Sequence, residues 1–134
     1  MFIKQLSVFV ENIPGRLERV SETLMDNNIN IESFSLADSS EFGVFRMIVS
    51  NPDLGLKVLK KEGFSAMLTD VLAIKISQKP GTLHKVLKRL YDEKISVEYM
   101  YTLSTSGDNT SIIMKLSDLE KGLKLLINND NIIK

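Results

Sequence analysis

The sequence contains no cysteine, no excess of charge of either sign and no long apolar run. The absence of cysteine excludes disulfide bonds, thiolate metal sites and cysteine nucleophiles. Because 17 basic residues balance 17 acidic ones, no basic surface for a nucleic acid or an anionic membrane is expected. No apolar segment approaches about 18 residues and the N-terminus lacks a signal-peptide pattern, so we expect a cytoplasmic protein without membrane contact.

Residues that carry catalytic chemistry are also scarce. His84 is the only histidine, and it corresponds to Glu18 on the polar side of a predicted helix, which favours a solvated side chain over a catalytic base. Glu32 and Glu98 recur at equivalent places, which indicates a shared structural role, because a general acid and a general base need different environments. No nucleophile–base pair, phosphate loop or metal-ligand cluster occurs. We therefore expect no enzyme activity, no catalytic residue, no cofactor and no metal.

The strongest feature that is present is an internal repeat. Pro-Gly-Arg-Leu at residues 14–17 returns as Pro-Gly-Thr-Leu at residues 80–83, 66 positions later. Farther along, Gly-Leu-Lys at residues 55–57 returns at residues 122–124, one position later than this offset predicts. We expect a single inserted residue near the turn before the third strand of the second copy. Repeats decide the fold, and two copies predict two small domains with pseudo-two-fold symmetry.

Both copies have the same order of predicted elements: strand, helix, strand, strand, helix, strand. Alternating apolar and polar residues predict the strands, and apolar residues at helical spacing predict the helices, the first of which begins near Pro14. In the first copy we expect strands over residues 4–10, 29–37, 42–49 and 64–68, helices between Pro14 and Asn27 and between Asn51 and Gly63, and a turn over residues 38–41. In the second copy we expect strands over residues 71–77, 96–104, 110–116 and 131–134, and helices over residues 81–94 and 118–127.

This order predicts the α+β class, with two ferredoxin-like βαββαβ units in tandem, antiparallel sheets side by side and helices on one face. The domains expected are residues 1–70 and residues 71–134. Each has about 65 residues, a size at which an isolated core is marginal, so each copy is expected to depend on the other. Residues 64–77 contain no glycine or proline, which predicts that the last strand of the first copy runs directly into the second copy.

The sheet face without helices is expected to carry apolar residues. Along the third strand Val44 and Ile48 point away from Phe45 and its neighbours, and Phe9 opposes the core residues of the first strand. An exposed apolar patch of this kind usually marks an interface. The pattern therefore predicts that the bare sheet faces pack together in a homodimer.

The loop between the first strand and the first helix is the strongest candidate for a binding site. A helix N-terminus offers unpaired N–H groups, and Gly15 allows a ligand to approach the backbone. Asn12 has an acceptor for an ammonium group and donors for a carboxylate, and a bound carboxylate would offset the charge of Arg16. An α-amino acid carries both groups on one carbon. Alternatively, Asn12 caps the helix, Gly15 only forms the turn and Arg16 is solvated.

The second copy differs at this loop, so the first loop is the better candidate. Tyr99 and Tyr101, on the second strand of the second copy, can line a pocket or pack in a core or dimer interface. Asp38 can contact an amino group or simply form the turn. The changes in the loop are Asn12 to Gln78, Ile13 to Lys79 and Arg16 to Thr82.

With this repeat, this loop and this order of strands and helices, both copies resemble the ACT domain, a small ferredoxin-like module that binds amino acids and regulates metabolic enzymes. The resemblance covers both copies almost from end to end, and it is to short proteins made of two ACT domains. The residues that carry it are 6–17, 28–31, 37–38, 42–43, 79–81 with 83, and 95–101.

In that family an amino acid binds at the interface of two domains, between the strand-to-helix loop of one and the second strand of the other. Gln78, in place of a short polar residue, departs from the family pattern. For this chain the resemblance implies a site formed by Asn12, Ile13, Gly15, Arg16 and Leu17 with Tyr99, Met100 and Tyr101. A reciprocal second site would use Lys79, Gly81, Thr82 and Leu83 with Ser33, Phe34 and Ser35.

The resemblance implies a non-catalytic regulatory protein that binds a free amino acid, forms a homodimer and acts on a partner metabolic enzyme. The alternative is a protein–protein interaction or dimerisation module whose ligand site has decayed. An enzyme of the same fold would need a nucleophile and a base, and an RNA-binding sheet would need basic residues with stacking aromatics. Neither pattern occurs. Tyr99, Met100 and Tyr101 favour a ligand with a bulky apolar side chain.

Overall fold

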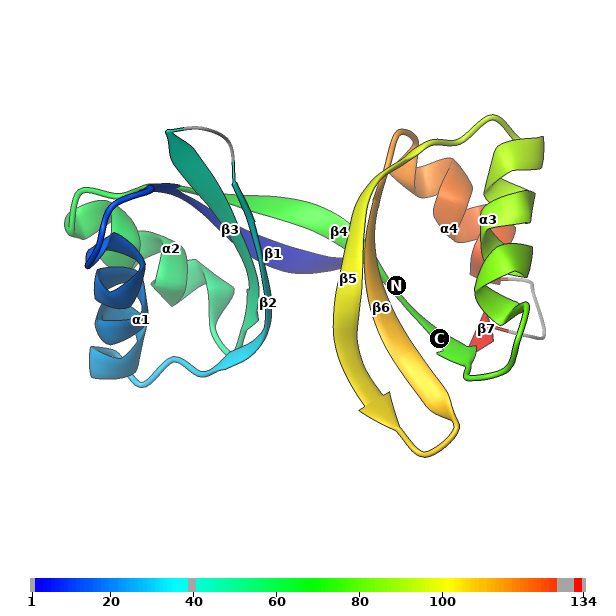
Figure 1. The fold of residues 1–134 in the computed structure, drawn as a ribbon, viewed down its shortest axis with the longest axis horizontal. Helices are drawn as coiled ribbons and strands as arrows, with labels where there is room; N and C mark the ends of the chain where they lie inside the picture. Colours follow the sequence, from blue (N-terminus) through cyan, green and yellow to red (C-terminus); the bar gives the residue numbers. More distant parts are fainter. Residues whose placement is uncertain (1, 39–40, 128–131, 134) are drawn as a thin grey trace. The chain divides into compact units, whose positions relative to one another are not determined.

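The structure, a computed structural model, describes residues 2–38, 41–127 and 132–133. The chain forms two compact units, of which the first comprises Lys4–Thr69 and the second Asp70–Lys134 together with residues 1–3. The elements of the first unit are β1 (Phe2–Glu11), α1 (Arg16–Asp26), β2 (Ile31–Asp38), β3 (Phe42–Val49), α2 (Pro52–Lys61) and the first part of β4 (Ser65–Ser77) (Figure 1).

In the first unit the strands follow the order β2-β3-β1-β4. β1 is antiparallel to β3, with Leu6 opposite Met47, and β3 is antiparallel to β2. Both helices cover the same face of these strands (Figure 1). Their apolar sides bury Leu24 and Leu59 against Leu6 and Met47, which are fully excluded from solvent. Helices on one face of an antiparallel sheet are the ferredoxin-like arrangement that the sequence predicts.

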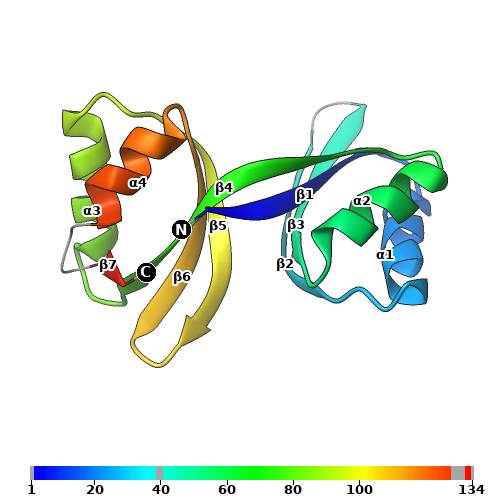
Figure 2. The ribbon, with the colours of Figure 1, turned by 180° about the vertical axis from the view of Figure 1, so that it is seen from behind.

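The second unit repeats this arrangement in the order β7-β4-β6-β5, and α3 and α4 share one face of its strands (Figure 2). The short strand β7 pairs with β4 through Ile132 and Ile133. Asn131 and Lys134, expected in the last strand, lie outside the described residues, as do residues 39–40 of the expected first turn. The elements of this unit are the remainder of β4, α3 (Thr82–Asp92), β5 (Val97–Ser106), β6 (Asn109–Leu116), α4 (Leu119–Ile127) and β7 (Ile132–Ile133).

The predicted fold class is confirmed, and so is the direct connection between the copies, because β4 is one strand from Ser65 to Ser77.

The register of the strands locates the inserted residue of the second copy. Both copies have one irregularity at the start of their second strand, but β5 has another between Thr102 and Ser104. Leu103 is therefore a bulge inside the strand, where an extra residue changes the direction of the strand and of nearby side chains.

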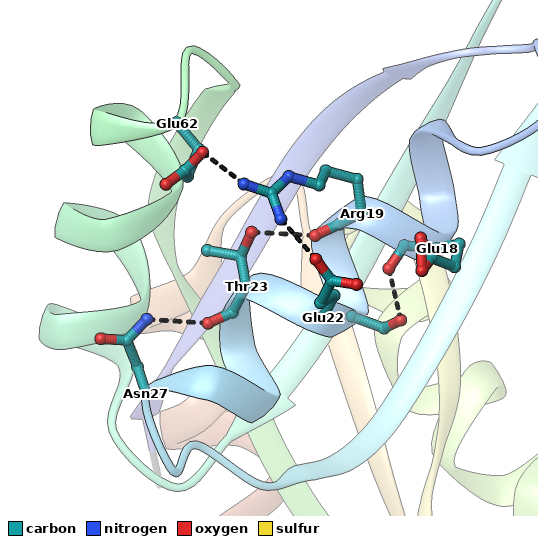
Figure 3. Close-up of polar contacts among 7 residues, drawn as sticks. Glu18, Arg19, Glu22, Thr23, Asn27 and Glu62 are labelled. Carbon is teal, nitrogen blue, oxygen red and sulfur yellow. Dashed lines mark hydrogen bonds and ion pairs between the residues drawn. The ribbon is translucent and has the colours of Figure 1, made fainter.

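A polar network joins the two helices of the first unit (Figure 3). Arg19 on α1 donates hydrogen bonds from Nη1 to Glu22 Oε1 (2.5 Å) and from Nη2 to Glu62 Oε2 (2.7 Å), and Glu62 is the residue after the end of α2. Hydrogen bonding to Glu62 raises the pKa of Arg19 above its usual value, with a smaller contribution from Glu22. Because all three side chains are partly exposed, this network orients the helices more than it stabilises them.

In the first unit, two of the apolar side chains expected to be exposed on the sheet face without helices are less exposed than the sequence pattern predicts. Phe9 is exposed, at 46% of its surface, whereas Val44 is half-buried and Ile48 is 7% exposed. The homodimer expected from this face stays a prediction.

Candidate functional site

The predicted binding loop of the first unit is a short turn between β1 and α1. Asn12 donates its backbone N–H to the carbonyl of Glu41 (3.1 Å), and Gly15 precedes the helix with a φ of 91°. No side chain in the described part of the chain caps this helix, so the structure does not bear out a capping role for Asn12. The positive φ is a backbone conformation that favours glycine. The first turn of α1 thus has backbone N–H groups that no side chain satisfies.

A small pocket of about 90 Å³ lies beside this loop. It brings together four of the predicted site residues, Asn12, Ile13 and Leu17 from the loop and helix and Asp38 from the end of β2. Glu11 also lines it, so this pocket has two carboxylates and no basic side chain. The remaining lining residues are Val10, Leu36 and Gly43.

Arg16 is directed to a different part of the unit. Its guanidinium carbon lies 4.6 Å from the centre of the Phe64 ring, a cation–π geometry, and Arg16 does not line the pocket beside the loop. Its Nε is buried without a hydrogen-bond partner among the described residues. A contact between Arg16 and a ligand carboxylate stays a prediction, whereas no pattern in the sequence signals the packing of Arg16 on Phe64.

A second, apolar groove of about 520 Å³ lies between α1 and β2 of the same unit. Phe34 lines it and packs on Phe45 with ring centres 5.8 Å apart. Leu17 and Leu36 line both this groove and the small pocket, so they lie between the two. Neither Ser33 nor Ser35, two residues predicted for the reciprocal site, lines either space.

The second unit has one larger pocket, of about 430 Å³, at the equivalent place. Of the residues predicted for the second site, Lys79 and Leu83 line this pocket. Met100 and Tyr101 of β5, which the resemblance pairs with the first loop, line the same pocket, whereas Tyr99 does not. The other lining residues are Ile76, Ser77, Gln78, Thr102, Thr110 and Ile112.

Gly81 and Thr82, the other predicted residues of this loop, shape the turn and do not line the pocket. Gly81 precedes α3 with a φ of 90°, as Gly15 precedes α1. Thr82 is buried, and its hydroxyl lies 3.1 Å from the hydroxyl of Ser77. The two loops therefore share a backbone conformation, but a polar side-chain contact replaces the arginine–aromatic contact of the first.

The repeat relates the lining of the second unit's pocket to residues of both spaces of the first unit. Leu36 lies between those two spaces, and a Cβ added to Gly43 would lie 3.1 Å from its Cδ1. The smaller Thr102 takes the place of Leu36 in the second unit, where the space is one pocket. Sequence reasoning from the loops misses Thr102 as a pocket residue, and the signal that identifies it is the alignment of the two copies strand by strand. The corresponding changes are Phe34 to Met100, Leu36 to Thr102 and Phe45 to Ile112.

Whether residues of both units meet at one ligand, as the resemblance implies, stays a prediction. Within the described residues, no group of three or more His, Asp or Glu side chains is placed to hold a metal ion. None of the helices that the structure describes is long and apolar enough to cross a membrane.

Comparison with known proteins gives the family of the chain. The family described as the ACT domain pair matches residues 1–133. A protein from Bacteroides thetaiotaomicron is 36% identical, with a TM-score of 0.91 over 99% of this chain and 92% of that one. The regulatory subunits of aspartate kinase from Thermus thermophilus (15% identity, TM-score 0.65, 92% of this chain and 90% of that one) and Thermus flavus (16%, 0.62, 93% and 92%) share the fold. A search of curated proteins found no match.

Proposed function

The chain belongs to the family of ACT domain pairs, and on that premise we propose that it is a non-catalytic regulatory protein that binds a free amino acid. The observation that carries the proposal is the pocket that recurs beside the strand-to-helix loop of each unit. Each pocket combines apolar side chains with a few polar groups, which is the usual composition of a small-molecule site.

The chemistry of the loops supports an amino acid as the ligand. In the first unit the amide of Asn12 and the carboxylate of Asp38 line one pocket and can accept hydrogen bonds from an ammonium group. In the second unit the ammonium of Lys79 lines the pocket and can bind a carboxylate. The aspartate kinase structures that share the fold are regulatory subunits, which supports a regulatory role.

We further propose that the chain acts as a homodimer on a partner metabolic enzyme. A bound amino acid would favour one packing of the protein, and the partner would bind the two packings with different affinity. Coupling between two such sites typically amounts to about 1–3 kcal/mol, which is sufficient for regulation.

The alternative function is an interaction module whose ligand site has decayed. The observation that favours it is the pocket beside the first loop, whose volume of about 90 Å³ is small for an amino acid. The groove next to this pocket and the pocket of the second unit, of about 520 and 430 Å³, are large enough for one.

The test is a thermal-shift screen of the purified chain against the twenty amino acids, followed by calorimetric titration of each one that shifts the melting temperature. Binding to the native state raises this temperature by mass action. A selective rise with one amino acid or one chemical group of them is the expected result. No rise with any amino acid would favour the interaction module, and light scattering at micromolar concentration would then test the homodimer separately.

A further inference from the structure

The two equivalent pockets differ in the sign of the charge that lines them. Glu11 and Asp38 line the pocket of the first unit, which has no basic side chain. Lys79 lines the pocket of the second unit, which has no acidic one. The repeat relates Glu11 to Ser77 and Ile13 to Lys79, so an acid is lost and a base is gained at neighbouring positions of the same loop.

Lys79 is available to bind a ligand. Its ammonium group forms no ion pair with any carboxylate in the part of the chain that the structure describes. The residue is exposed at the mouth of the pocket, and apolar side chains form much of the lining behind it. An ammonium group binds a carboxylate by a charge-assisted hydrogen bond, which is about twice as strong as a neutral one.

A second donor lies in the same lining. Gln78 donates a hydrogen bond from Nε2 to Thr110 Oγ1 (2.7 Å), and both residues line the pocket. Because Thr110 Oγ1 accepts this bond, its own hydroxyl proton is free to be donated to a ligand oxygen. The lining thus offers a cation and an oriented hydroxyl for a carboxylate, but no acidic side chain for an ammonium group.

The rest of the lining selects an apolar body. Ile76, Leu83, Met100 and Ile112 contribute side chains without hydrogen-bonding groups other than the thioether. The volume of about 430 Å³ lies in the range of about 300–1,000 Å³ that is typical of ligand pockets. A branched aliphatic or aromatic side chain fits both the volume and the apolar character.

We propose that the pocket of the second unit binds small carboxylates with an apolar body, and that it recognises the carboxylate and not the amino group. Apolar amino acids and the corresponding 2-oxo acids are therefore both ligands, whereas the corresponding amines are not, because Lys79 repels an ammonium group. The inference rests on the proposed function and specifies its ligand class.

The test is calorimetric titration of the full chain with two matched sets of probes. The first set is leucine, 4-methyl-2-oxopentanoate and isopentylamine, and the second is phenylalanine, phenylpyruvate and 2-phenylethylamine. Within the set that binds, we expect comparable affinity for the amino acid and the 2-oxo acid, and at least about tenfold weaker binding of the amine.

Two variants that each remove one positive charge locate the site. Lys79→Met is expected to weaken binding of the amino acid and of the 2-oxo acid by about tenfold or more. Lys85→Met is the matched control, because Lys85 is exposed on α3 and does not line the pocket. Equal melting temperatures of the two variants without ligand show that both are folded.

Each outcome bears on a different claim. An amino acid that binds while its 2-oxo acid does not would overturn this inference and leave the proposed function standing. Equal affinities of Lys79→Met and Lys85→Met would also overturn it, since the ligand would then bind elsewhere. Failure of all twenty amino acids and of both 2-oxo acids to bind would contradict the proposed function as well.

Discussion

The two units of this protein have the same elements in the same order, but the space that is one pocket of about 430 Å³ in the second unit is divided in the first into a pocket of about 90 Å³ and a groove of about 520 Å³. Both loops begin their helix after a glycine with positive φ, so the backbone does not account for the difference. The difference comes from the side chains of the neighbouring strand, β2 in the first unit and β5 in the second. Leu36 lies between the two spaces of the first unit, and the smaller Thr102 lines the single pocket of the second. In this repeat, therefore, the position of the pocket beside the loop is the same in both units, whereas the side chains that line it differ.

The first unit uses its loop for packing that the second unit lacks. Arg16 lies over the ring of Phe64, whereas Thr82 at the equivalent position contacts the hydroxyl of Ser77. We infer that the two units have divided their roles, the first contributing mainly stability and the second mainly ligand binding.

The largest expected effect comes from an exchange of the equivalent residues Leu36 and Thr102. Thr102→Leu gives the second unit the residue of the first and is expected to weaken binding of the apolar ligand by about a hundredfold, or about 2.7 kcal/mol. Leu36→Thr is the reciprocal variant and should leave this affinity unchanged. Calorimetric titration measures both, and unchanged binding by Thr102→Leu would mean that the second pocket is not the site.

A smaller effect, on the free energy of unfolding, is expected to differ between the second helix of one unit, α4, and that of the other, α2. A Cβ at Gly122 would lie 2.3 Å from Leu116 Cδ1, whereas at Gly55 it would lie 2.9 Å from Leu6 Cδ2. Overpacking opposes the gain in helix propensity, so we expect Gly122→Ala to lower the free energy of unfolding by about 1 kcal/mol and Gly55→Ala to have little effect. Urea denaturation measures both, and a larger loss at Gly55 would contradict the difference in packing.

Features of the fold and of the candidate site that depend on local sequence patterns can be predicted from the sequence, whereas features that depend on contacts between distant residues cannot. The fold is predicted because each copy supports the other, and the continuity of β4 follows from the absence of glycine and proline. The loop pattern is local and agrees with a pocket beside each strand-to-helix loop, whereas the pairing of each loop with the second strand of the other copy stays a prediction. The sizes of the pockets are not predicted, because they depend on Leu36 and Thr102, which lie on another strand. The contact between Arg16 and Phe64 joins residues distant in sequence, and no local pattern signals it.

A still smaller effect should decide the role of Arg16. Arg16→Met keeps an unbranched side chain of similar size but removes the charge over Phe64, and a cation–π pair at a partly exposed site is worth about 0.5–1 kcal/mol. We expect a loss of that size in the free energy of unfolding, with unchanged ligand affinity. Lower affinity with unchanged stability would instead support the contact with a ligand carboxylate that the sequence predicts.

The smallest effect is expected where the helices of the first unit are joined at the surface. Glu62→Gln removes one of the two ion pairs of Arg19, and exposed pairs of this kind contribute little and are screened by salt. The melting temperature should change slightly at low ionic strength and not at all in 1 M salt. A clear loss of stability in high salt would mean that the contact between α1 and α2 depends on more than charge.

The division of roles between the two units is tested most directly by a two-dimensional ¹H–¹⁵N NMR titration of the full chain with leucine and, separately, with phenylalanine. If the account is correct, the backbone signals of Lys79, Leu83, Met100, Thr102 and Ile112 shift with added ligand and saturate together. Their counterparts at Ile13, Leu17, Phe34, Leu36 and Phe45 then stay unchanged. Shifts confined to this second set would place the ligand in the first unit and contradict the account.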